Sequence, residues 1–404
     1  MTAGGGVAFV HDPRLSRYEL HPDHPFKPLR LELTRSLLEH VGLLTPAEVV
    51  PPVELDEGAL LAVHDPGYVA AVKAASLGRP GAEASRHGLG TADNPVFPGM
   101  HDLVSLVCAG TVAAMDAVVE GRALRAVNLA GGLHHALVDR ASGFCVYNDL
   151  AVAIRRVVDR HGLRVAYLDL DAHHGDGVQW LFYDDPAVMT ISLHESGHYL
   201  FPGTGHTYET GKGAGRGLSV NVPLEPFTED GSYLAAFEAV VPAALRAFAP
   251  DVIVLQAGAD AHRLDPLADL ALTLTGMAAA YRRTVELADE LTGGRLVATG
   301  GGGYDPYRTV PRAWAQLWAA LTVRSVPAEL PRAWADEWRE RLPSGVELPR
   351  RALDGPDDYP PQPKRAQVTR RNQVVADRVL DALTTIWRDT GLSTGAAGRG
   401  AAAR

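Results

Sequence analysis

Short apolar runs that alternate with amphipathic segments constrain the fold of this chain more than any other feature. Strand-like runs cover residues 164–170, 188–194, 218–222, 251–256 and 295–299, and a further one begins near residue 125. Helical patterns cover residues 29–41, 101–120, 149–160, 230–248, 276–291, 307–321 and 372–388. Another helix is expected to begin at Pro66, with Asp65 as its N-cap. Because such alternation favours a buried parallel sheet, we predict an α/β fold: one doubly wound parallel sheet with helices on both faces.

The last part of the chain differs from the rest in composition. After about residue 325, Pro, Arg and Glu become frequent, and small residues dominate the final stretch GLSTGAAGRGAAAR. We therefore predict a main domain over residues 1–325 and an extension over 326–390 that packs on or near it. The tail over 391–404 is predicted to be disordered.

Charge and cysteine content argue against several classes of protein. The 404 residues carry a formal net charge of −10, whereas proteins that follow nucleic-acid phosphates carry a basic face. The two cysteines, Cys108 and Cys145, imply no disulfide framework and fit a reducing cytosol. The N-terminal segment lacks a secretory signal pattern, and no run of about 18 uncharged apolar residues predicts a membrane span. We expect a cytoplasmic protein that binds neither nucleic acid nor membrane.

The segment LDLDAHHGDG (168–177) places three aspartates and two histidines directly after an apolar run. Side chains alternate along an extended segment, so Asp169, Asp171 and His173 point one way. Two of the three could bind a divalent ion such as Zn²⁺, and Asp260 at a later strand end could supply a further ligand. Three protein ligands leave a position open for water. The competing interpretation is that these residues cap a helix or form a salt-bridge cluster.

Two adjacent histidines, His134 and His135, follow a third strand-like run in the segment GGLHHA (131–136). A lone histidine is more often a packing residue, but a pair beside a metal site suits proton transfer. Histidine bases need partners that orient them, and Asp169 and Asp176 are available for that role.

Four glycines and Tyr304 follow the run 295–299, in the segment GGGGYDP (300–306). Glycines let the backbone approach a bound group closely. A phosphate-binding loop is the alternative, but no Lys-Ser/Thr pair follows the glycines. Tyr304 could donate a hydrogen bond to an oxyanion.

The chain resembles the zinc-dependent histone deacetylase superfamily in an ordered series of motifs. Besides the three segments quoted above, these motifs are HPDHPFKPLR (21–30), GTADNPVFPGM (90–100), GFCVYND (143–149), ISLHE (191–195), FPGTG (201–205) and LQAGADAHRLDPL (255–267). The resemblance is strongest to the bacterial acetoin-utilisation (AcuC-like) deacetylase branch, over about residues 5–325. It implies an arginase/deacetylase-like fold, with residues 1–325 as the catalytic domain. The implied activity removes acetyl groups from lysine side chains of an acetylated protein or peptide, with Zn²⁺ as cofactor and Fe²⁺ as an alternative in the cell.

The resemblance also implies chemical roles. The implied set is Asp171, His173 and Asp260 for the metal, and His134, His135, Asp169, Asp176 and Tyr304 for catalysis. His135 would be the general base and then the acid, and His134 would give electrostatic support. Asp169 would pair with His134, and Asp176 with His135. Tyr304 would stabilise the oxyanion.

A second implied set binds substrate and ions. The substrate-binding positions are Asp93, Gly143, Phe144, Phe201 and Leu267. The two phenylalanines would form the walls of a narrow tunnel, the glycine would leave room beside them, and the aspartate on the rim would accept hydrogen bonds from the substrate backbone. Arg30 would line an inner channel for acetate release. A structural K⁺ ion would bind through Asp169, Ser192 and Leu193.

Three alternatives remain open from the sequence. Arginase-like hydrolases use two manganese ions, but the position two residues after Asp260 is His262 rather than a carboxylate. An acetylpolyamine amidohydrolase would share the metal chemistry, although Leu267 stands where a gatekeeping glutamate can select polyamines. A catalytically inactive acyl-lysine binding module would have little reason to retain the complete set. We interpret Cys145, which has no assigned base, and His174 as structural residues.

Overall fold

Eight parallel strands form one sheet within residues 5–355 and 357–392, which the computed structural model describes. In chain order the strands are β1 (Val7–Val10), β2 (Val49–Val50), β3 (Arg125–Asn128), β4 (Val165–Asp169), β5 (Val188–Glu195), β6 (Ser219–Leu224), β7 (Val252–Gln256) and β8 (Leu296–Thr299). Their order across the sheet is β2-β1-β3-β8-β7-β4-β5-β6, and every neighbouring pair is parallel.

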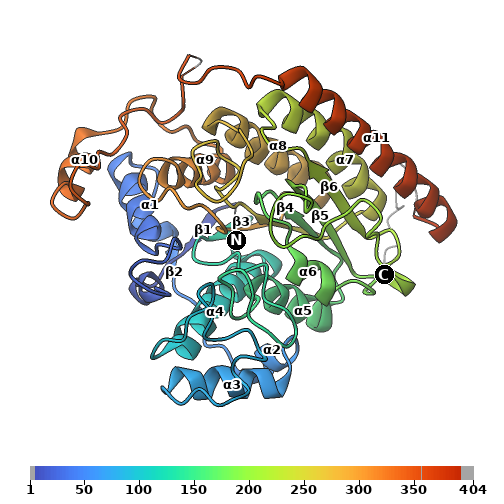
Figure 1. Ribbon diagram of the computed structural model, residues 1–404, viewed down its shortest axis with the longest axis horizontal. Coiled ribbons are helices and arrows are strands. Elements are labelled where there is room, and N and C mark those ends of the chain that lie inside the picture. The colour runs from blue at the N-terminus through green and yellow to red at the C-terminus, as the bar shows by residue number, and fades with distance from the viewer. Residues whose placement is uncertain (1–4, 356, 393–404) are drawn as a thin grey trace.

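Helices cover both faces of this sheet (Figure 1). One face carries α1 (Leu29–His40), α7 (Asp230–Phe248), α8 (Leu274–Thr292), α9 (Val310–Thr322) and α11 (Arg365–Thr390), with α10 (Arg332–Trp338) packed on α1. The other face carries α2 (Glu57–Leu61), α3 (Pro66–Ser76), α4 (Met100–Val119) and α5 (Asp149–His161), with α6 (Asp176–Leu181) beside α5. This architecture confirms the predicted doubly wound α/β fold.

Strand β4 shows why its sequence reads as an uninterrupted apolar run. Val165 and Tyr167 belong to the hydrophobic cluster on the α4–α5 side, whereas Ala166 and Leu168 belong to the cluster on the α7–α8 side. All four side chains are almost completely buried. Because both faces of the strand are covered, neither face needs polar residues.

The strand order brings distant parts of the chain together. Strands β3, β8, β7 and β4 are adjacent in the centre of the sheet, although other strands and helices separate them in the sequence. Their carboxyl ends point to the same edge because all four are parallel. The segments that follow these four strands are the ones in which the sequence concentrates His, Asp, Gly and Tyr304.

Most predicted elements are present, and their ends differ from the prediction by a few residues. Asp65 caps α3 by accepting hydrogen bonds from the N–H groups of Gly67 and Tyr68, and α5 ends at Gly162 in a left-handed conformation. Helix α9 begins at Val310 rather than at residue 307, since the N–H groups of Thr309 and Val310 bond to the Asp305 carbonyl in a turn.

The remaining differences concern short or highly polar elements. Helix α11 begins at Arg365 rather than at residue 372, because its first two turns are polar and show little hydrophobic period. Strand β2 and helices α2, α6 and α10 have 2, 5, 6 and 7 residues and are too short to predict from periodicity. The four-residue strand β1 was missed as well.

Helix α4 is long and apolar enough to cross a membrane by length and composition alone, and no other helix in the described ranges meets that test. It contains Asp102 and Asp116, and 72% of its apolar window is buried inside the fold. Core helices commonly pass the same test, so this is weak evidence for a span.

The C-terminal extension packs on the sheet side that carries α7. Helix α11 lies along α7 and the edge strand β6. The Trp387 indole N–H donates to the Gly217 carbonyl at 2.7 Å, and the Asn372 side chain accepts from the N–H of Glu225 at 2.9 Å. The division of the chain at residue 325 stays a prediction, and residues 393–404 of the predicted tail lie outside the described residues.

Truncation of Trp387 tests how firmly the extension is attached. We expect Trp387→Ala to lower the free energy of unfolding by about 3–5 kcal/mol, because it removes a buried ring and its hydrogen bond. Urea denaturation measures this value. Trp180→Ala is the control, since Trp180 is 40% exposed. Equal stability of both variants would contradict the packing role of α11.

Candidate active site and metal centre

Three potential metal ligands meet beyond the carboxyl ends of β4 and β7. Asp171 and His173 follow β4, and Asp260 follows β7. One ligand atom from each residue lies within 4.8 Å of those of the other two, and all three residues are buried. No other group of this kind occurs in the part of the chain that the structure describes. The predicted alternation of Asp171 and His173 along one face is therefore compatible with a shared ion.

Nearby amide groups hold the two carboxylates in place. Asp171 Oδ2 accepts hydrogen bonds from Gln256 Nε2 at 2.7 Å and from the Gly302 N–H at 2.8 Å. Asp260 Oδ1 accepts from the Ala172 N–H at 2.8 Å. These donors come from β7 and from the loops after β8 and β4, so the sheet order itself fixes the positions of the oxygens.

Glycines permit this close approach. A Cβ atom at Gly258 would overlap with the Asp171 carboxylate, and a Cβ at Gly302 would overlap with the Asp260 carboxylate. The glycine run 300–303 therefore brings backbone against two carboxylates, which is a different task from cradling a phosphate.

The donor set fits a divalent metal. One imidazole and two carboxylates are common ligands for Zn²⁺ and similar ions, and three ligands leave an open position. Burial and the charge of Asp171 raise the pKa of Asp260 to about 6. A bound cation would relieve this crowding of negative charge.

Two histidine–aspartate pairs lie beside the metal ligands. His134 Nδ1 is 2.9 Å from Asp169 Oδ2, and His135 Nδ1 is 2.7 Å from Asp176 Oδ1. The centroids of the two imidazole rings are 4.0 Å apart, and both residues are buried. The structure thus brings together the four residues in the predicted pairing.

The two imidazoles differ in their electrostatic surroundings. Burial alone would lower the pKa of His134, but the charges of Asp169 and Asp171 and the hydrogen bond to Asp169 raise it to about 9. Burial and the neighbouring His134 charge lower the pKa of His135 to about 4, against the opposing effect of Asp176. Near pH 7 this leaves His134 charged and His135 neutral, so His135 is the one able to accept a proton.

Tyr304 stands at the same site with aromatic rings around it. Its ring centroid is 6.4 Å from that of His173 and 5.7 Å from that of Phe144. The ring of Phe201 lies 5.0 Å from that of His135. Burial, followed by the charges of the nearby carboxylates, raises the pKa of Tyr304 well above its usual value, so the hydroxyl keeps the proton that it could donate.

Gly143 lies between His135 and Phe201. Its φ is +50°, and a Cβ there would overlap with the His135 ring and come 2.8 Å from the Phe201 ring. Cys145 is buried nearby, with its thiol donating to the Gly143 carbonyl at 3.2 Å. Burial raises the pKa of Cys145 well above its usual value, which agrees with a structural thiol rather than a nucleophile.

The remaining predicted substrate positions lie around these rings. Asp93 is exposed, and its charge acts on the buried His24, whose ring centroid is 4.4 Å from that of Phe144. Leu267 is partly buried, and its N–H donates to Asp265 Oδ1 at 2.9 Å. Arg30 is buried, and its Nη1 donates to the Gly303 carbonyl at 2.9 Å.

The predicted potassium ligands lie on two paired strands. Asp169 of β4 and Ser192 of β5 are register partners, and Leu193 follows in β5. Asp169 Oδ2 also accepts from the Tyr167 hydroxyl at 2.6 Å, and Ser192 Oγ is 2.8 Å from a ring nitrogen of His194. The role of an ion at this position stays a prediction.

His262 gives no support to the two-metal alternative. Its Nε2 is 2.9 Å from Asp354 Oδ2, and its Nδ1 accepts from the Leu264 N–H at 3.2 Å. Both ring nitrogens are therefore engaged away from Asp171 and Asp260.

Several residues of the site were missed by the sequence analysis. Gln256 ends β7, four residues before Asp260, and its side chain donates to Asp171. Asp265 Oδ2 accepts from the Tyr304 N–H at 2.7 Å. Asp149, in the quoted motif GFCVYND, accepts from the N–H groups of Gly132 and Leu133. His174 Nδ1 is 2.8 Å from Thr204 Oγ1, which connects the turn that carries Asp171 and His173 to the loop that carries Phe201. Gln256 and Asp265 lie in the quoted motif LQAGADAHRLDPL, and Asp149 lies in GFCVYND. This membership was the sequence signal that could have identified them.

Comparison with known proteins defines the class. Residues 24–321 match the histone deacetylase domain family, and the chain belongs to this family. Family membership supports a deacetylase, which is a hydrolase, and the family generally depends on a metal. The site described above lies within the matched residues.

The relatives identify the branch. The chain is 45% identical to acetoin utilization protein AcuC of Bacillus subtilis over 376 residues, which cover 93% of this chain and 97% of the relative. It is 40% identical to AcuC of Staphylococcus aureus (strain MRSA252) over 372 residues, which cover 92% and 95%. A crystal structure of a histone deacetylase homologue from Aquifex aeolicus matches with a TM-score of 0.80 and 29% identity, covering 91% of this chain and 100% of that one. The chain is thus an AcuC-like member of the histone deacetylase family.

Metal analysis tests the ligand set. We expect one divalent ion per chain by elemental analysis, and Asp260→Asn should weaken metal binding by a factor on the order of 100 or more, since it removes a charged ligand. Asp116→Asn serves as the control, because that buried carboxylate pairs with Arg156 on α5. Two ions per chain, or unchanged metal content in Asp260→Asn, would overturn the assignment.

Proposed function

We propose that this protein is a zinc-dependent deacetylase that removes acetyl groups from lysine side chains of proteins. The single observation that carries the proposal is the convergence of the three potential metal ligands, two aspartate-anchored histidines and Tyr304 on one site. Each of these groups answers one requirement of amide hydrolysis. A bound Zn²⁺ would lower the pKa of a water molecule and polarise the acetyl carbonyl.

The two histidines would divide proton transfer and charge stabilisation between them. Neutral His135 accepts a proton from the attacking water at Nε2, since its Nδ1 faces Asp176. The water oxygen adds to the acetyl carbon, the C–N bond then breaks, and His135 returns the proton to the lysine nitrogen. Charged His134 stabilises the negative charge that develops beside it, and Asp169 keeps it oriented.

Tyr304 would stabilise the carbonyl oxygen as it becomes negative. Its hydroxyl stays protonated and donates a hydrogen bond to that oxygen. Asp265 fixes the backbone of Tyr304 by accepting from its N–H. The donor is thereby positioned before the substrate arrives.

The rings at the entrance support a lysine side chain as substrate. Phe144 and Phe201 would flank the apolar methylenes, and Gly143, which has no side chain, lets Phe201 and His135 lie close to this backbone. Exposed Asp93 would accept hydrogen bonds from the substrate backbone. Leu267 gives no negative charge that would select a polyamine, which is the alternative substrate class.

Further parts of the proposal concern ions and location. Asp169, Ser192 and Leu193 would hold a structural K⁺ ion, and Fe²⁺ could replace Zn²⁺ in the cell. Two free, buried cysteines support a cytoplasmic location with reducing conditions.

Removal of one hydroxyl tests the oxyanion role. We expect Tyr304→Phe to lower kcat by about 10²- to 10³-fold while the metal content is kept, because the lost donor acts on the transition state. Steady-state kinetics with elemental analysis measures both. Tyr307→Phe, three residues along the same loop, should keep kcat within about twofold of the native value. Native turnover in Tyr304→Phe would remove this role.

A substrate comparison tests the lysine assignment. We expect kcat/KM for an acetyl-lysine peptide to exceed that for an N-acetylated polyamine by about tenfold or more, and Leu267→Glu to shift the ratio towards the cationic polyamine. The same zinc-loaded preparations serve for both substrates. A native preference for the polyamine would keep the metal chemistry and refute the substrate class.

A further inference from the structure

The C-terminal extension reaches the back of the loop that carries Asp260. After α9 the chain runs through α10, which packs on α1, and then turns back. The returning segment pairs with the outgoing one, because the N–H of Leu330 bonds to the Arg350 carbonyl and that of Ala352 to the Ala328 carbonyl. This return places Asp354 in the interior, with its side chain 2% exposed.

The carboxylate of Asp354 joins three separate parts of the domain. Its Oδ2 accepts from the Leu274 N–H at the start of α8 at 2.8 Å and lies 2.9 Å from His262 Nε2. Its Oδ1 accepts from Arg312 Nη1 of α9 at 3.1 Å. Burial alone would raise the pKa of Asp354, but its hydrogen bonds from His262 and Leu274 and the nearby positive charges lower it to about 2.

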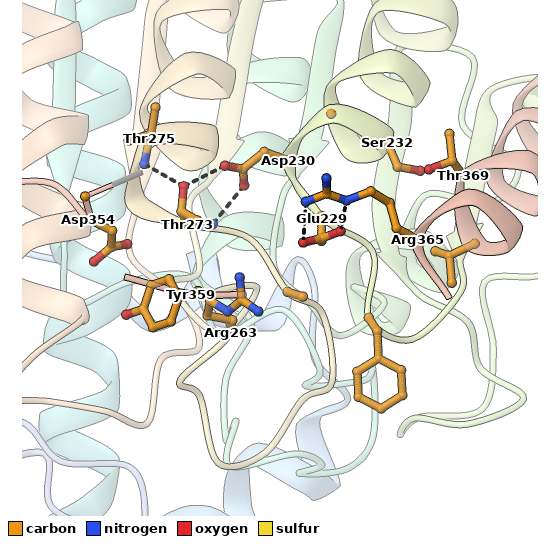
Figure 2. A pocket seen from close by; sticks show the side chains of 15 residues that line it. Glu229, Asp230, Ser232, Arg263, Thr273, Thr275, Asp354, Tyr359, Arg365 and Thr369 are labelled. Atoms are coloured by element: carbon orange, nitrogen blue, oxygen red, sulfur yellow. Dashed lines mark hydrogen bonds and ion pairs between the residues drawn. The ribbon is translucent and has the colours of Figure 1, made fainter. Parts of the chain in front are cut away.

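One side of Asp354 borders a cavity rather than packed core. Figure 2 shows Asp354 at the start of α8. In the wall of the same cavity, the Glu229–Arg365 ion pair connects the start of α7 to α11. Asp354 forms part of the wall of an open cavity of about 690 Å³. On that side its position therefore depends on its hydrogen bonds.

His262 carries this attachment into the active-site loop. Its Nδ1 accepts from the Leu264 N–H, and its carbonyl accepts from the Asp265 N–H at 2.8 Å. Asp260 lies two residues before His262, and Asp265 fixes the N–H of Tyr304. Hydrogen bonds thus connect Asp354 of the extension, through His262, to the loop that lies between Asp260 and Asp265.

We propose that Asp354 and His262 form a positioning pair through which the C-terminal extension holds Asp260 and Tyr304 in their active geometry. This inference rests on the proposed metal-dependent deacetylase, in which Asp260 binds the metal and Tyr304 the carbonyl oxygen. Neither member of the pair touches the substrate. The C-terminal extension then contributes to the geometry of the active site in addition to packing on the domain.

The test compares two truncations within the extension. Asp354→Ala and Asn372→Ala each remove a buried side chain that makes three hydrogen bonds to the domain, but those of Asn372 go to Glu225, Thr228 and Ser232, and none goes to His262. The full-length proteins are studied at a temperature where urea curves show both to be folded. Zn²⁺ affinity is measured by chelator competition, and kcat and KM on an acetyl-lysine peptide.

We expect Asp354→Ala to raise the Kd for Zn²⁺ and lower kcat by about tenfold each, as for other groups that orient metal ligands, with KM changed by less than about twofold. Asn372→Ala should lower stability without changing the Kd or kcat. Native Kd and kcat in Asp354→Ala, or equal losses in both variants, would overturn the proposal.

If Asp354→Ala does not fold, two variants of His262 test the positioning role instead. His262→Gln keeps an N–H donor for Asp354 and should retain the native Kd for Zn²⁺, whereas His262→Leu removes it and should raise the Kd. Equal Kd values would contradict the positioning role. The Kd comparison needs no substrate, so it remains decisive even if the native protein fails to hydrolyse acetyl-lysine, which would refute the proposed function separately.

Discussion

Two carboxylates of like charge, Asp171 and Asp260, are buried side by side, and the structure of the site depends on keeping them there. Burial of charge is costly unless hydrogen bonds or a cation compensate for it. The protein supplies hydrogen bonds from backbone N–H groups after β4 and β8 and from the Gln256 amide, and it omits side chains at Gly258 and Gly302 to bring these groups close. The imidazole of His173 completes a donor set that suits a divalent ion.

Buried carboxylates also give the two neighbouring histidines, His134 and His135, different pKa values. His134 lies near Asp169 and Asp171 and is held in its charged form, and its charge in turn favours the neutral form of His135. A single pair of adjacent histidines thereby provides one electrostatic group and one proton acceptor. The asymmetry comes from the environment, because the two residues are chemically identical.

Sequence reasoning was most successful where local patterns determine structure. The alternation of apolar runs and helical segments predicted the parallel sheet, and the alternation in LDLDAHHGDG predicted that Asp171 and His173, which follow β4, lie on one side. It failed for Gln256, Asp265 and Asp354, because their contacts join segments far apart in the chain and no local period reports them. The first turns of α11 were missed for a related reason: they show no clear apolar period, and Arg365 and Arg371 instead pair with the distant Glu229 and Glu225.

The strand order also determines when the site can exist during folding. Strand β3 pairs with β8, and β7 lies between β8 and β4, so neighbours in space come from opposite halves of the chain. A nascent chain that has emerged only as far as Asp260, just after β7, carries every potential metal ligand but lacks β8, the strand that joins β7 to β3. Long-range pairing of this kind forms slowly, since distant segments must meet before any contact is made. The active centre can therefore form only after β8 and the loop that carries Tyr304 have been synthesised, although all three potential metal ligands leave the ribosome earlier.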